Sequence, residues 1–314
     1  MNNIDIHQLT LLKGSVMADW DALGTRPQDQ FDVRRRVFVG CLGAYDIGGE
    51  TVPIAEIEDV VVGNSSLSFD DYLRCRITHL LIKIYIDHDP FNEVFGLVRG
   101  MGLSRFGLLL HLQDNFLLKH DSLSALINSF VAGSQAPLFD DYAQINSFVN
   151  NLENIAKYVA GEYGQNELLT HRVKAYLECS DDMHEALREA AVSYIDGHGL
   201  LTDDIEQYVE EGIRFSRLRR FDHLSYKSET SGEFTFDFLK AEELGYEVDP
   251  STLKTARVRL KAYYDSDDLE TIGRLVDMYG IQTMRQIGKL FQRNNLLLMK
   301  RAVKEVELNE ALER

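Results

Sequence analysis

The stretch IAEIEDVVVGNSSLSFDDYLRCR, residues 54–76, contains the signals for a strand, a turn and the start of a helix in direct succession. Its apolar residues Ile57 and Val60 lie within an acidic segment, residues 56–62, that predicts a strand. Residues 63–66 are small and polar, which is typical of a turn. Ser68 followed three residues later by Asp71 is a capping box, which satisfies two unpaired amides at a helix start. The stretch therefore predicts a strand that leads into a capped helix.

Helical patterns dominate the chain after this junction. Apolar residues recur at three- and four-residue spacing from Phe69 to Tyr85, as on one face of a helix. Asp89 before Pro90 predicts the N-cap and first turn of another helix, and Ser104 is a candidate cap as well. The later stretches with a helical pattern are residues 145–159, 166–177, 181–195, 202–215, 269–279 and 282–304.

The remaining patterns predict a small amount of strand. Apolar runs at residues 4–12 and 37–43, together with residues 56–62, predict short N-terminal strands. Alternation at Phe234 and Phe236, and again at Val258, predicts a pair of strands near the C-terminus. We therefore expect a mainly α fold with a minor β part.

Three domains follow from these patterns. They are a mixed strand segment over residues 1–66, a multi-helix domain over 67–225, and a C-terminal strand pair with basic helices over 226–314. Polar residues 226–233 are the candidate boundary before the last segment.

Composition narrows the class of protein. The 314 residues are 45% hydrophobic, which favours a packed globular chain over disorder. A formal net charge of −17 argues against general binding to nucleic acid or to anionic membranes, because phosphate binding draws on Lys and Arg. No apolar run approaches the roughly 20 residues of a membrane span, and the first residues lack a signal-peptide pattern. The sequence predicts a cytoplasmic protein that binds neither nucleic acid nor membrane.

No motif in the chain predicts a catalytic residue or a metal site. Cys41, Cys75 and Cys179 are too far apart to form a CxxC-type ligand pair, so we expect small buried side chains. The run of Asp87, His88 and Asp89 could ligate a metal or could start a helix. The second interpretation fits the preference for acidic residues at helix N-termini.

Two basic clusters are candidate substrate- or partner-binding sites. Arg34, Arg35 and Arg36 precede an apolar strand, and on a strand they would alternate faces. At least one of them should then point inward to a carboxylate or a ligand. In the last helical stretch no acidic residue occurs from 285 to 304, and the candidate residues there are Arg285, Lys289 and Arg293.

For the basic helices, including the arginines at 214, 217, 219 and 220, the sequence leaves open an alternative to partner binding. These side chains could pair with acidic helices of the same chain instead of a partner.

The sequence LLKGS at residues 11–15 resembles the end of a late barrel strand in radical S-adenosylmethionine enzymes of the cobalamin-binding type. Residues 30–45, 56–61 and 66–72 follow in the order found after that barrel. The similarity covers about residues 4–120, with a fainter similarity at residues 234–237.

Members of that family hold a [4Fe-4S] cluster with a CxxxCxxC motif, cleave S-adenosylmethionine at the cluster, and bind cobalamin in a separate N-terminal domain. This chain has neither the motif nor that domain. The resemblance thus implies the C-terminal part or a split subunit of such an enzyme, which covers the barrel and shapes the substrate site but is not catalytic alone.

We therefore expect no cofactor on this chain by itself. S-adenosylmethionine, the [4Fe-4S] cluster and cobalamin would belong to a partner chain or to a preceding region. A stand-alone helical protein-interaction module without redox activity is the alternative.

Overall fold

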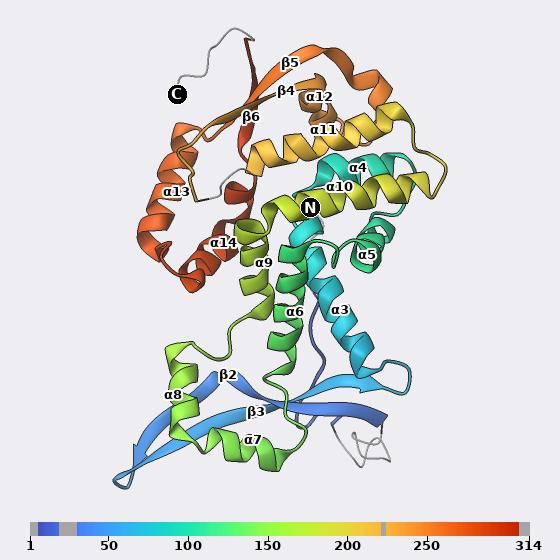
Figure 1. Cartoon of the computed structure of the whole chain (residues 1–314). Coiled ribbons are helices and arrows are strands. Elements are labelled where there is room, and N and C mark those ends of the chain that lie inside the picture. Colours follow the sequence, from blue (N-terminus) through green and yellow to red (C-terminus); the bar gives the residue numbers. More distant parts are fainter. Residues whose placement is uncertain (1–5, 19–29, 221–223, 308–314) are drawn as a thin grey trace. The chain divides into compact units, whose positions relative to one another are not determined.

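The computed structural model describes residues 6–18, 30–220 and 224–307, without the side chains of residues 292–299. In this part of the chain the fold is mainly α with a minor β part, as the sequence predicted. The chain forms two compact units (Figure 1). Of the described residues, unit 1 comprises residues 80–127, 169–220 and 224–307, and unit 2 comprises residues 6–18, 30–79 and 128–168.

Unit 2 is built on a long antiparallel hairpin of β2 (Phe31–Ile47) and β3 (Glu50–Asn64), with the short strand β1 (Thr10–Leu11) on the other side of β3. Gly48 and Gly49 connect the two long strands with φ values of 64° and 90°. Such left-handed pairs form the tight turns whose twist matches a hairpin. The strands are longer than the short apolar runs had indicated.

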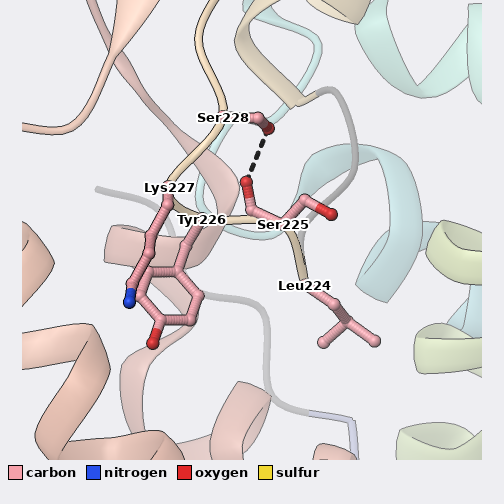
Figure 2. A pocket seen from close by; sticks show the side chains of 5 residues that line it. All are labelled: Leu224, Ser225, Tyr226, Lys227 and Ser228. Atoms are coloured by element: carbon pink, nitrogen blue, oxygen red, sulfur yellow. Dashed lines mark hydrogen bonds between the residues drawn. The ribbon is translucent and has the colours of Figure 1, made fainter.

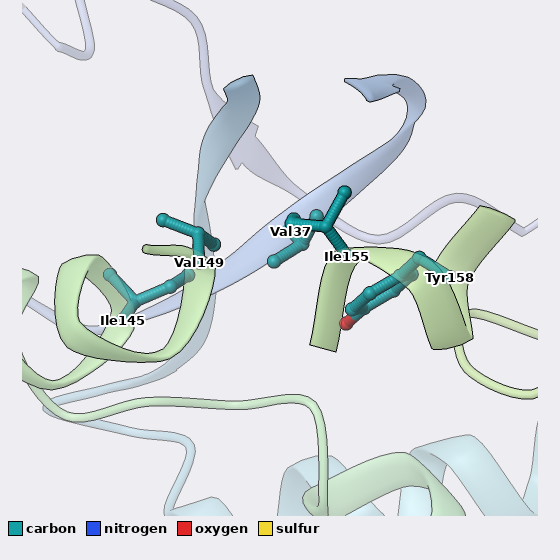
Figure 3. Close-up of a cluster of buried hydrophobic side chains, with 5 residues drawn as sticks. All are labelled: Val37, Ile145, Val149, Ile155 and Tyr158. Carbon is teal, nitrogen blue, oxygen red and sulfur yellow. The ribbon is translucent and has the colours of Figure 1, made fainter. Parts of the chain in front are cut away.

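Helices α7 (Tyr142–Val149) and α8 (Leu152–Ala160) pack against the hairpin. Figure 3 shows Val37 of β2 between side chains of these two helices, which are Ile145, Val149, Ile155 and Tyr158. The sequence predicted one helix across residues 145–159, and this prediction was wrong. Asn151 ends the continuity because its side chain accepts a hydrogen bond from the backbone amide of Glu153 at 2.9 Å and thereby starts α8.

The other face of the hairpin packs against α3 (Phe69–Leu81) and the end of α6 (Asp121–Gln135). Val60 and Val62 are fully buried there beside Tyr72 of α3. The predicted capping box starts α3. The amide of Asp71 donates to Ser68 Oγ at 3.1 Å, and the amide of Ser68 donates to Asp71 Oδ2 at 3.2 Å.

Unit 1 is mostly helical. Ser104 caps α5 as predicted, with its hydroxyl accepting from the amide of Gly107 at 3.0 Å. The predicted cap at Asp89 was wrong: α4 starts after Phe91, and Asp89 has a φ of 51° and pairs with Arg105. Unit 1 contains the end of α3, the start of α6 and, from Leu169 onward, α9 (Glu167–Glu178). Its other described helices are η1 (Ile82–Ile86), α4 (Asn92–Gly100), α5 (Arg105–Asn115), α10 (Ser180–Asp196), α11 (Asp203–Arg220), α12 (Phe238–Glu243), η2 (Pro250–Leu253), α13 (Ser266–Tyr279) and α14 (Met284–Met299).

Unit 1 also contains an antiparallel sheet of order β4-β5-β6. Its first two strands, β4 (Thr230–Phe236) and β5 (Lys254–Tyr263), confirm the predicted pair. The third, β6 (Ala302–Val306), lies where the sequence predicted a helix to residue 304, so that prediction was wrong. Pairing with β5 satisfies backbone groups that a helix would have satisfied locally. Among the described residues, no helix is long and apolar enough to cross a membrane.

Candidate ligand-binding cavity

The three consecutive arginines of β2 alternate faces of the hairpin, as predicted. Arg35 is buried, and its Nε lies 3.4 Å from Asp59 Oδ1. Arg34 is on the opposite face and pairs with Asp32 and Asp140. Arg35 therefore points inward to a carboxylate, and Arg34 is held at the surface by two acidic side chains.

Arg36 shares its face of the strand with Arg34 but lies in a different environment. Its Nε donates to Glu58 Oε2 at 2.7 Å, and its Nη1 donates to Gln8 Oε1 at 2.5 Å. Gln8 in turn donates to the hydroxyl of Tyr72. This network ties the segment before β1 to β2, β3 and α3, and it forms one wall of a cavity in unit 2.

The basic residues predicted near the C-terminus belong to unit 1. Arg285 and Lys289 are exposed on α14, and the side chain of Arg293 lies outside the described residues. The structure therefore does not bring them into one described site with Arg34, Arg35 and Arg36.

The arginines at the end of α11 are paired within unit 1. Arg219 Nη1 lies 2.8 Å from Glu242 Oε2, and Arg220 Nη1 lies 3.5 Å from Glu93 Oε1. Burial alone would raise the pKa of Glu242, but Arg219 and Lys300 outweigh it and lower the pKa. These contacts favour intramolecular pairing, the alternative that the sequence left open for this cluster.

The cavity in unit 2 has a volume of about 520 Å³ and lies where β2 leaves the sheet. Val37 pairs with Ile57 and Leu42 pairs with Ala55, so residues 38–41 of β2 face Glu56 alone on β3. Such a bulge turns a strand away from its ladder and commonly re-aims side chains at functional sites. Phe38, Val39 and Gly40 of this bulge line the cavity.

Arg76 of α3 lines the same cavity. It lies one helical turn after Tyr72, and its guanidinium is 5.5 Å from the centre of the Phe130 ring. Burial lowers the pKa of the Arg76 guanidinium, and nearby Arg36 lowers it further, although an arginine stays charged in proteins. No described side chain or backbone group accepts a hydrogen bond from its buried Nε.

The end of α6 forms the floor of the cavity. Ser134 is 8% exposed, and its Oγ has no hydrogen-bond partner among the described residues. The Glu167 carboxylate lies close to the preceding Gly133, where a Cβ would be 2.5 Å from Glu167 Oε2. The loop after α8 closes the rim in the same way: Gly164 has a φ of 70°, and a Cβ there would lie 2.6 Å from Val39 Cγ2.

Sequence reasoning missed Arg76 and Ser134 as site residues. Arg76 is the last residue of the stretch that predicts the strand-to-helix junction, yet nothing in the spacing links it to Arg36, which is forty positions earlier. Ser134 occurs in an ordinary helical pattern. Only the packing of α3 and α6 on one face of the hairpin brings the three residues to one cavity.

The cysteines do not contribute to this cavity. Cys179 is buried as predicted, but Cys41 and Cys75 are exposed, so the prediction was wrong for those two. A hydrogen bond with Glu56 raises the pKa of the Cys41 thiol, which disfavours the reactive thiolate. In the described part of the chain, no group of three or more His, Cys, Asp or Glu side chains is arranged to hold a metal ion.

A second hollow, in unit 1, is a weaker candidate. It has a volume of about 470 Å³, and the described residues that line it are five consecutive ones of one loop, Leu224, Ser225, Tyr226, Lys227 and Ser228 (Figure 2). Ser228 Oγ donates to the carbonyl of Ser225 at 2.6 Å, which stabilises the loop itself. Among the described residues, polar side chains from separate elements do not converge on it, and such convergence is what characterises ligand sites.

The chain matches no known family model and no curated protein.

Proposed function

We propose that unit 2 binds a small ligand with an anionic group, a carboxylate or a phosphate, in the cavity between the β2 bulge, α3 and α6. The observation that carries this proposal is Arg76. Its guanidinium lines the cavity, and its buried Nε has no acceptor among the described residues. Buried polar groups in folded proteins nearly always have partners, so each exception calls for an explanation. A bound anion would accept hydrogen bonds from the guanidinium where Arg76 lines the cavity.

The surroundings of Arg76 support an anion over a neutral ligand. The planar guanidinium offers several N–H donors in a fork that fits a carboxylate or a phosphate. Arg36 lines the same cavity, and its positive charge acts on Arg76. Ser134 adds a hydroxyl with no partner in the described residues. The volume of about 520 Å³ is within the range of small-molecule sites, which is about 300–1,000 Å³.

The proposed activity is binding, and we assign no reaction to the cavity. That this chain is a split subunit of a cobalamin-type radical S-adenosylmethionine enzyme remains a prediction, which rests on the resemblance of residues 4–120. If that prediction holds, the anionic ligand would be the substrate or a part of it. Co-purification with a chain that carries CxxxCxxC and a cobalamin domain is the test of that role.

The anion site is tested by substituting Arg76 in the full chain. Titrations with inorganic phosphate and with 3-phenylpropionate, followed by calorimetry and by ligand-detected NMR at low salt, should show binding to the unmodified protein. We expect Arg76→Gln to weaken the affinity by about tenfold or more, because a hydrogen bond to a charged group contributes about 1.5–3 kcal/mol. Arg76→Lys, which keeps the charge but loses the fork, should lie between the two.

The matched control is Arg74→Gln. Arg74 is exposed on the same helix, two residues away, and does not line the cavity. Its substitution should leave both affinities unchanged, and circular dichroism should show that both variants are folded. The proposal is overturned if Arg76→Gln binds these anions as tightly as Arg74→Gln does, or if the unmodified protein binds neither of them nor any other ligand with a carboxylate or phosphate group.

A further inference from the structure

The cavity contains negative as well as positive side chains. Among the described residues that line it, Glu58 and Glu167 accompany Arg36 and Arg76. Glu58 is held by Arg36 at 2.7 Å, and the carboxylate of Glu167 lies against the backbone of Gly133. Glu167 also acts electrostatically on Arg76. The formal charges of these four side chains sum to zero.

This balance of charges narrows the class of ligand further than the need for an anionic group does. A simple anion next to Arg76 would be attracted by the two guanidiniums and repelled by the two carboxylates, and inside a partly buried cavity such interactions are stronger than in water. A ligand that carries an ammonium group beside its anion would turn the repulsion into attraction. A carboxylate oxygen has more than one lone pair, so Glu58 can accept from an ammonium while it keeps its bond to Arg36.

Part of the cavity lining is apolar and exposed to solvent. Phe38 is 39% exposed and Val39 is 47% exposed, although both are large hydrophobic residues of the β2 bulge. They line the cavity together with Pro137 and Leu168. An apolar substituent on the ligand would cover this surface and add hydrophobic binding energy.

We propose that the ligand is a zwitterion with an apolar substituent, of the class of an apolar α-amino acid. Its carboxylate would lie at Arg76 and Ser134, its ammonium at Glu167 and Glu58, and its side chain against Phe38 and Val39. This proposal rests on the anion-binding function proposed above and specifies the class of its ligand.

Three ligands that share one apolar group test the proposal on the full, unmodified chain. L-phenylalanine carries both charges, 3-phenylpropionate lacks the ammonium, and phenethylamine lacks the carboxylate. Calorimetric titration under one buffer condition gives the three affinities. We expect L-phenylalanine to bind about tenfold or more tightly than either of the other two, since each of them can make only one of the two charge interactions.

A substitution of Glu167 tests where the ammonium group of the ligand binds. Glu167→Gln should weaken the binding of L-phenylalanine by about tenfold and leave the binding of 3-phenylpropionate equal or tighter. Glu162→Gln, in the exposed loop between α8 and α9 and outside the cavity lining, is the matched control and should change neither affinity. The ligand comparison uses the unmodified protein, so it stands even if Glu167→Gln does not fold.

The outcomes separate the two proposals. If 3-phenylpropionate binds as tightly as L-phenylalanine and depends on Arg76, the anion site stands and the zwitterion is wrong. If phenethylamine binds as tightly as L-phenylalanine and Arg76→Gln has no effect, the cavity selects a cation and both proposals fail. If no ligand of the series binds and phosphate does not bind either, both fail as well.

Discussion

Arg220 and Glu93 form an ion pair inside unit 1, where their side chains are 3% and 2% exposed. Nη1 of Arg220 also donates to Ser216 Oγ at 2.6 Å, and its guanidinium lies 5.3 Å from the centre of the Phe91 ring. This arginine is thus compensated by a carboxylate, a hydroxyl and an aromatic ring. Arg76 of unit 2 lies against the ring of Phe130, and Glu167 acts on it electrostatically. The buried Nε atoms of both arginines lack a hydrogen-bond acceptor in the described residues. The two arginines differ because Arg76 lines a cavity, whereas Arg220 pairs with a buried carboxylate.

The buried pair leads to an expectation for stability. Arg220→Met should lower the free energy of unfolding by about 3–5 kcal/mol, because removing one partner leaves the charge of Glu93 buried and uncompensated. The measurement is the midpoint of urea unfolding, followed by circular dichroism. Arg217→Met is the control: its pair with Asp181 is exposed and 3.8 Å long, and its loss should change the free energy by less than about 1 kcal/mol. Equal effects of the two substitutions would contradict the structural role of Arg220.

Helix caps and a strand bulge are the features that shape unit 2 at the scale of elements. The reciprocal bonds of Ser68 and Asp71 set the start of α3, and thereby the position of Arg76 two turns later. The hydrogen bonds with Ser68 also lower the pKa of Asp71, as expected for a carboxylate that accepts an amide at a helix start. The bulge of β2 opens the sheet edge beside α3. Both features are local, and each positions residues that line the cavity: the cap positions Arg76, and the bulge positions Phe38, Val39 and Gly40.

Removal of the cap should destabilise α3 measurably. We expect Ser68→Ala to lower the free energy of unfolding by about 1 kcal/mol, with a range of about 0.5–2, because the amide of Asp71 loses its acceptor. Ser65→Ala, in the exposed turn before the helix, is the matched control and should have little effect. Thermal unfolding of the three proteins measures the difference. A cap substitution no more harmful than Ser65→Ala would show that the box does not stabilise the helix.

At the scale of the whole molecule, unit 2 is formed by two segments that are separated in the sequence. The hairpin is near the N-terminus, whereas α7, α8 and the end of α6 come from residues 128–168. A boundary at residue 66, which the sequence had suggested, would separate Val60 and Val62 from their partner Tyr72. It would also separate Val37 from the helices that bury it (Figure 3).

A fragment of residues 1–66 should therefore not fold by itself. It contains every strand of the first sheet but leaves both of its apolar faces exposed to water, and an isolated hairpin is at best marginally stable. Proton NMR of this fragment should show poorly dispersed amide signals, whereas the full chain under the same conditions should show a folded spectrum. A well-dispersed spectrum of the fragment would refute the dependence of the hairpin on residues 69–73 and 128–168.

Periodicity and caps determined the fold class and most of the elements. The capping box at Ser68, the cap at Ser104 and the strand pair near Phe234 are signals between residues at most a few positions apart, and such signals are readable from sequence. The predictions failed where contacts with residues distant in the sequence determine the local structure. β6 is a strand because β5 offers it hydrogen bonds, and the break at Asn151 lets two short helices cover the hairpin.

The candidate site shows the same division. The sequence by itself determined that Arg36 lies on a strand with a face opposite to that of Arg35, and that Arg76 lies on the helix capped by Ser68. Only the tertiary structure decided that Arg36, Arg76 and Ser134 line one cavity. The physical reason is that backbone hydrogen bonds and caps act between near neighbours, whereas burial of the hairpin brings together helices that are far apart in the chain.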